Sequence, residues 1–137
     1  MSKRVTIKEF TTLFNGLVES SKKTNDPIPE MSPSNLDKID GCLKTPFMTF
    51  DGKDLYKTIF NKASILLYVL IKNHPLGNGN KRMAYITTYF FLNKNGVNLN
   101  LSDSIVYGLV VKVANSDPNK KDYIVAYINS TLKNNSK

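Results

Sequence analysis

Apolar residues recur at spacings of three and four along most of the chain, which is the period of an amphipathic helix. Near the start, Thr6 and Glu9 have the spacing of a capping box that opens a helix. Strand-like alternation is almost absent. We therefore expect an all-α protein, a compact bundle of about six helices with one small β-hairpin at most. The pattern places the helices at about residues 7–22, 36–43, 54–73, 80–95, 102–115 and 119–133.

The third and fourth of these helices carry the most apolar side chains. The third begins at Asp54 and ends near Asn73, because Pro75 disfavours a helical residue before it. The fourth, residues 80–95, is apolar nearly all round, so we expect it to be the buried central helix. Gly96 fits the left-handed position that ends it. The apolar stripe of the third helix comprises Leu55, Ile59, Ala63, Leu66 and Leu70.

Two segments between the helices read as irregular. Residues 25–34 contain three prolines, and Ser34 or Asn35 then caps the short second helix. Residues 45–51 run into an Asp51-Gly52 turn signal, so this segment is where a short hairpin would form.

The composition is that of one globular domain, residues 1–137, with 41% hydrophobic residues. Cys42 is the sole cysteine, which we interpret as a buried apolar side chain in a reducing compartment. The start of the chain lacks an apolar signal core, and the longest apolar run, residues 63–71, is too short to span a bilayer. We expect a cytoplasmic protein that has no membrane partner.

The formal net charge is +8, and Arg4 and Arg82 are the only arginines among 19 basic residues. Specific readers of DNA favour arginine for contacts to guanine. Scattered lysines are more typical of a solvated surface, so we do not expect a nucleic-acid partner. A basic nucleic-acid-binding module stays open as an alternative.

The segment from His74 to Arg82 carries the candidate chemistry. It reads His-Pro-Leu-Gly-Asn-Gly-Asn-Lys-Arg and leads directly into a helix. A helix start offers free amide hydrogens and a positive potential. The positive charges of Lys81 and Arg82 are unfavourable there unless an anion binds beside them. His74 is the only histidine, so it is the one side chain whose ordinary pKa lies near neutrality. Singly, a histidine that ends a helix and a Gly-Asn-Gly turn are unremarkable; together they predict a phosphate site beside a general base.

This segment resembles the Fic/Doc motif, His-x-Phe-x-Asp/Glu-Gly/Ala-Asn-Gly/Lys-Arg. The matching residues are His74, Gly79, Asn80, Lys81 and Arg82, and Asn-Lys-Arg is similar to the Doc (death-on-curing) branch. The resemblance extends over most of the helices. It implies a Fic/Doc-like domain whose core motif is residues 74–82, acting as a transferase that uses ATP or another nucleoside triphosphate to modify a protein hydroxyl.

The resemblance also implies roles. His74 would be the catalytic base, and residues 45–52 would be a flap that aligns a target strand beside the site. The residues expected to hold the nucleotide phosphates are Gly77, Gly79, Asn80, Lys81 and Arg82. The residues expected to form the flap are Phe47, Met48, Thr49, Phe50, Asp51 and Gly52.

Adenylylating members carry a second arginine where this chain has Tyr85, so the resemblance favours phosphoryl transfer to Ser or Thr, with adenylylation (AMPylation) as the alternative. In the Doc branch the target is typically a translation factor, and the protein is a toxin held by an antitoxin. The self-inhibitory Ser/Thr-x3-Glu-Gly/Asn motif is absent from the sequence. A separate antitoxin chain is therefore the expected partner.

Asn78 stands where the family has an Asp or Glu that binds Mg²⁺. Magnesium prefers anionic oxygen ligands, so Asn78 is expected to be a weak or water-mediated ligand to a metal held by the nucleotide. A catalytically degenerate Fic domain is the other interpretation of this change.

Overall fold

Helices make up most of the computed structural model, which describes residues 2–30 and 35–136. The predicted all-α class is confirmed. Ser34, one of the two caps expected for the second helix, lies outside the described residues. The α-helices are α1 (Ile7–Ser21), α2 (Leu36–Lys44), α3 (Ile59–Lys72), α4 (Asn80–Lys94), α5 (Asp103–Ala114) and α6 (Lys121–Asn134). Short 3-10 turns, η2 (Thr45–Phe47) and η3 (Pro118–Lys120), and two strands, β1 (Thr49–Phe50) and β2 (Lys53–Asp54), complete the described elements.

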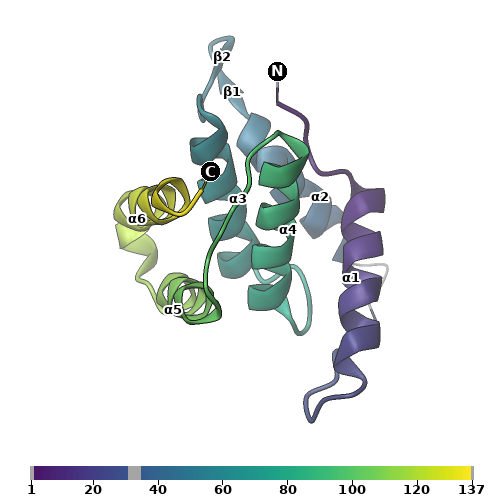
Figure 1. Cartoon of the computed structure of the whole chain (residues 1–137). Coiled ribbons are helices and arrows are strands. Elements are labelled where there is room, and N and C mark those ends of the chain that lie inside the picture. The colour runs from purple at the N-terminus through teal and green to yellow at the C-terminus, as the bar shows by residue number, and fades with distance from the viewer. Residues whose placement is uncertain (1, 31–34, 137) are drawn as a thin grey trace.

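The centre of the bundle is α3 (Figure 1). Ten consecutive residues, 62–71, are buried, and α2, α4, α5 and α6 all contact this helix. The expectation that residues 80–95 form the central helix was wrong. One face of α4 packs on α3, but Tyr89 on another face is 42% exposed. Its partly buried aromatic side chains border a cavity and the surface, which apolar composition alone does not distinguish from a core.

The start predicted for α3 was also wrong. Asp54 belongs to β2, where it pairs with Thr49, and Leu55 is 49% exposed. The helix begins at Ile59, because the side chain of Thr58 caps it by accepting a hydrogen bond from the Asn61 N–H at 3.0 Å. The other end, at Lys72, agrees with the prediction from Pro75.

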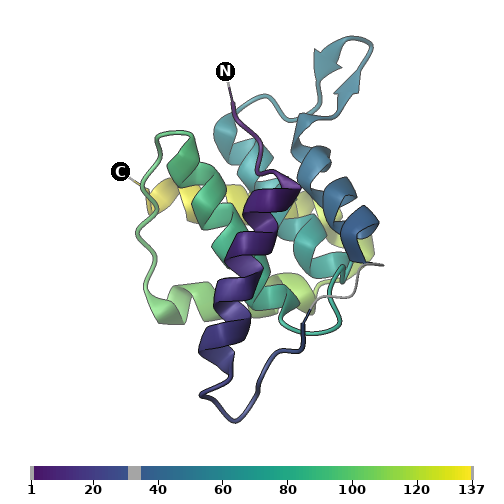
Figure 2. The same cartoon turned by 90° about the vertical axis from the view of Figure 1, so that its right-hand side faces the viewer.

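The predicted hairpin forms, but it lies at the far end of α3 from the loop that carries His74 (Figures 1 and 2). Asp51 and Gly52 both have positive φ angles, 54° and 75°, as a tight two-residue turn requires. The buried Lys62 ties the base of the hairpin to the core by donating to the carbonyl oxygen of Tyr56. The 14 residues of α3 separate its two ends by about 21 Å.

Several local predictions are confirmed. Thr6 and Glu9 form the capping box of α1, and Gly96 follows α4 with a φ of 84°. Cys42 is buried, and burial raises the pKa of its thiol. Glu9 also forms an ion pair with Lys94, with Nζ and Oε1 2.7 Å apart, and this pair joins the start of α1 to the end of α4.

The buried face of α3 should dominate stability. Leu67 is fully buried, so Leu67→Ala should lower the free energy of unfolding by about 2–5 kcal/mol through lost burial and a cavity. Urea denaturation measures this loss. Leu55→Ala is the matched control and should cost less than about 0.5 kcal/mol. Equal losses would contradict the observed start of α3.

Candidate functional site

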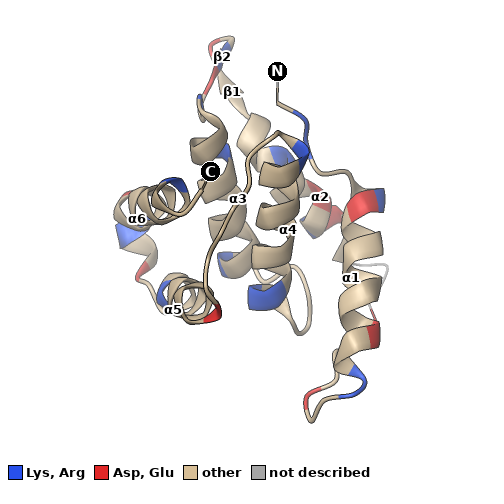
Figure 3. Ribbon diagram, viewed as in Figure 1, with Lys and Arg blue, Asp and Glu red and all other residues tan. Residues whose placement is uncertain are grey.

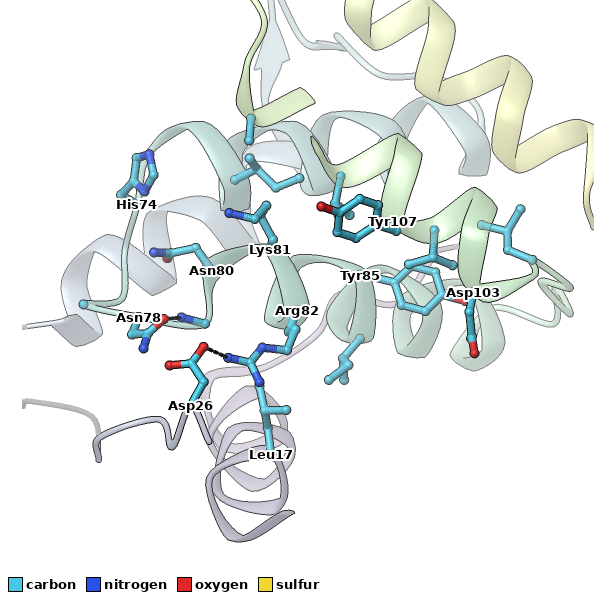
Figure 4. A pocket seen from close by; sticks show the side chains of 18 residues that line it. Leu17, Asp26, His74, Asn78, Asn80, Lys81, Arg82, Tyr85, Asp103 and Tyr107 are labelled. Atoms are coloured by element: carbon cyan, nitrogen blue, oxygen red, sulfur yellow. Dashed lines mark hydrogen bonds and ion pairs between the residues drawn. The ribbon is translucent and has the colours of Figure 1, made fainter. Parts of the chain in front are cut away.

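A cavity of about 660 Å³ lies between the start of α4, α5 and the segment that follows α1 (Figure 4). This volume is in the range of small-molecule sites. The structure brings the predicted catalytic, phosphate-binding and metal residues together in its lining: His74, Gly77, Asn78, Gly79, Asn80, Lys81 and Arg82.

His74 occupies a strained backbone position directly after α3. Asn73 ends the helix, and His74 follows it with a φ of 45°, in the left-handed region where glycine or asparagine is the usual choice. A side chain in this region costs about 1–3 kcal/mol and persists when its surroundings require it. The imidazole is exposed at the cavity and forms no hydrogen bond with any described residue. It is therefore accessible to accept a proton.

The loop between α3 and α4 is held by the side chain of Asn80. Its Oδ1 accepts a hydrogen bond from the Leu76 N–H, and its Nδ2 donates to the Leu76 carbonyl oxygen, both at 2.9 Å. The Nδ2 of Asn35 donates to the Pro75 carbonyl oxygen at 2.7 Å. The amide of Asn80 thus shapes the loop, a role that sequence reasoning, which assigned it to phosphate, did not anticipate.

Gly79 turns the loop into α4. Its φ of 82° is left-handed, and a Cβ there would lie 3.0 Å from Cδ1 of Ile28. Gly79 is the N-cap of α4, and no side chain caps the helix. The first N–H groups of the helix consequently have no intrahelical partner, and such an arrangement favours an anion.

Two cations lie in that first turn, which holds no acidic residue. Figure 3 shows the start of α4 as basic, while other basic residues are distributed over several helices. Lys81 is exposed, and Nη2 of Arg82 lies 3.5 Å from Oδ2 of Asp26. Sequence reasoning missed Asp26, because it lies 56 positions from Arg82 and no local pattern links the two residues.

Away from the loop, the cavity is mainly apolar. Tyr85 and Ile86 of α4 and Val106 and Tyr107 of α5 contribute to its lining. Burial raises the pKa of the Tyr85 phenol, and the nearby Tyr89 and Asp103 raise it further. The cavity therefore has a cationic end at the loop and a mainly apolar, aromatic end between the two helices, where Asp103 is the charged residue of the lining.

The side chain of Asn78 bonds to its own loop, and the predicted flap residues lie away from the cavity. The Oδ1 of Asn78 accepts a hydrogen bond from the Gly79 N–H at 2.7 Å. Phe47 packs edge-to-face on Phe91 with ring centroids 6.1 Å apart, while Phe50 is 74% exposed. Residues 47–52 lie outside the cavity lining and at the other end of α3, so they do not flank His74. The structure thus puts these residues away from His74, and their role in aligning a target stays a prediction.

The loop from His74 to Arg82 joins two helices of an all-α bundle and lines a cavity, as the resemblance to the Fic/Doc motif led us to expect. A model of the Fic/DOC family matches residues 5–92, and the chain belongs to that family. Over 61 residues it is 41% identical to "Toxin Doc" of Mycolicibacterium smegmatis. This match supports the predicted Doc branch.

The match covers 44% of this chain and 47% of the Mycolicibacterium protein. The matched part of the chain therefore spans about half the length of that relative. None of the helices in residues 2–30 and 35–136 combines the length and apolar character that a membrane crossing needs.

The two glycines of the loop give a matched test of its geometry. Gly79→Ala should lower the free energy of unfolding by about 1–2 kcal/mol, because alanine is strained at this left-handed position. Gly77 has open space around it and no positive φ, so Gly77→Ala should change stability by less than about 0.5 kcal/mol. Urea denaturation of both variants compares them, and equal losses would contradict the loop conformation.

Proposed function

We propose that this chain is a Doc-like protein kinase, which transfers a phosphoryl group from ATP to Ser or Thr of a target protein, as the toxin of a toxin–antitoxin pair. One observation carries the proposal: His74 stands in a strained conformation at the edge of a cavity whose cationic end is the uncapped start of α4. Strained residues cluster at functional sites, where the surrounding structure holds them in place.

The two ends of the cavity suggest how the nucleotide lies. Its phosphates would accept hydrogen bonds from the free N–H groups in the first turn of α4, and Lys81 and Arg82 would balance their negative charge. The base would lie in the apolar end, against Tyr85 and Tyr107. For the phosphates to reach the guanidinium of Arg82, they would displace Asp26 from it.

The chemistry requires one proton acceptor near the phosphates. A nitrogen of neutral His74 would take the proton from the target hydroxyl as its oxygen attacks the γ-phosphorus. The bond between that phosphorus and the β–γ bridging oxygen breaks, and ADP leaves. The strained backbone of His74 would keep its imidazole at the cavity rather than packed on the helix end.

Two observations favour phosphoryl over adenylyl transfer. Tyr85 replaces the second arginine that adenylylating members carry, and the chain is similar to a protein named Toxin Doc. That name also supports an antitoxin as the partner, on a separate chain. The target would be a cytoplasmic protein such as a translation factor.

The test is a bacterial lysate incubated with this protein, Mg²⁺ and ATP that carries the label at either the α- or the γ-phosphate. We expect γ-label on a protein. His74→Asn should reduce this labelling by about 10²–10⁴-fold, because asparagine tolerates the left-handed backbone but cannot act as the base. Unfolding curves and ATP binding should stay close to those of the unmodified chain.

The other outcomes identify the alternatives. Label from the α-phosphate that depends on His74 would make the protein an adenylyltransferase. Labelling equal in His74→Asn would contradict the role of His74, and binding of ATP without any labelling would indicate a degenerate domain. A nucleic-acid-binding module would instead show affinity for RNA or DNA that falls steeply with salt and ignores His74.

A further inference from the structure

Asn78 stands at the motif position of an acidic magnesium ligand, but its side chain belongs to the loop. The Oδ1 of Asn78 accepts a hydrogen bond from the Gly79 N–H at 2.7 Å, immediately before α4 begins. An amide oxygen adds no negative charge, and magnesium binds through anionic oxygens of the protein and the nucleotide. This side chain therefore does not fit the role of the family's magnesium ligand.

The surroundings of Asn78 are positive. Lys81 and Arg82 follow it in the first turn of α4 and line the same cavity. The start of a helix adds about half a positive charge. This arrangement attracts phosphates, and it opposes a divalent cation that only a neutral amide would hold.

The two carboxylates of the cavity lining do not replace the missing ligand in this arrangement. Oδ2 of Asp26 lies 3.5 Å from Nη2 of Arg82, so this carboxylate is paired with a cation. Asp103 lies at the start of α5, at the opposite end of the cavity from His74 (Figure 4).

We infer that this site binds the phosphates of a nucleotide through cations and backbone amides, without a magnesium ligand from the protein, so that it accepts metal-free ATP as well as it accepts the magnesium complex. The inference rests on the proposed nucleotide function. Lys81 and Arg82 perform the charge neutralisation that a bound metal would otherwise share.

The test is isothermal titration of the whole chain with ATP, once with excess Mg²⁺ and once with EDTA. For the unmodified chain the two dissociation constants should agree within about threefold. Lys81→Gln should weaken the binding of metal-free ATP by about tenfold, because a cation beside the phosphates is lost. Lys57→Gln, an exposed lysine before α3, is the matched control and should leave both constants unchanged.

Two further variants sharpen the result. Asn78→Asp should weaken the binding of metal-free ATP. It should also create a preference of about tenfold for the magnesium complex, because the new carboxylate supplies the anionic ligand. Asp26→Asn should tighten the binding of metal-free ATP, because the carboxylate that competes with the phosphates for Arg82 is lost. A thermal melt of each variant shows that it has folded.

A preference of tenfold or more for the magnesium complex in the unmodified chain would overturn the inference and leave the proposed kinase standing. If Asp26→Asn removed that preference, Asp26 would be the ligand. Absence of ATP binding in both buffers would overturn the nucleotide function itself, and this inference with it.

Discussion

The pair of hydrogen bonds between Asn80 and the backbone of Leu76 is the contact on which the rest of the site depends. The chain must leave α3, reverse, and enter α4 within a few residues. Few groups can satisfy the backbone of such a short loop, and an unsatisfied, partly buried peptide group costs about 1–3 kcal/mol. One asparagine satisfies both the donor and the acceptor of Leu76. It thereby fixes the distance between His74 and the start of α4.

Left-handed residues at both ends of the loop complete this arrangement. His74 follows α3 at φ 45°, and Gly79 precedes α4 at φ 82°. Glycine takes such angles freely, whereas histidine does so at a cost. The burial of ten consecutive residues of α3 stabilises the fold and offsets the cost of the strained backbone at His74. The structure thus keeps His74 and the uncapped start of α4 together at the edge of the cavity.

The sequence predicted what local chemistry determines. The capping box at Thr6, the cap at Gly96 and the loop residues from His74 to Arg82 depend on neighbours only a few positions away, and the structure gathers those loop residues in one cavity. Helical periodicity was less informative about boundaries, because Leu55 continues the apolar stripe of α3 although it lies between β2 and the start of the helix.

The remaining features depend on contacts between distant residues. Burial of α3 rather than α4 follows from which helices surround it, and the pairing of Asp26 with Arg82 joins positions 56 residues apart. The hairpin was predicted from its Asp51-Gly52 turn, but its distance from His74 follows from the length and direction of α3. Patterns in a single sequence carry no signal for such arrangements.

The central claim is that the start of α4 binds the phosphates of a nucleotide. The most direct measurement is a nuclear magnetic resonance titration, in which the backbone amide chemical shifts of the labelled protein are recorded as ATP is added. The account predicts the largest shifts at the amides of residues 79–82, with smaller shifts at Tyr85 and Tyr107. Shifts confined to the hairpin, or spread evenly over the lysine-rich surface, would contradict it.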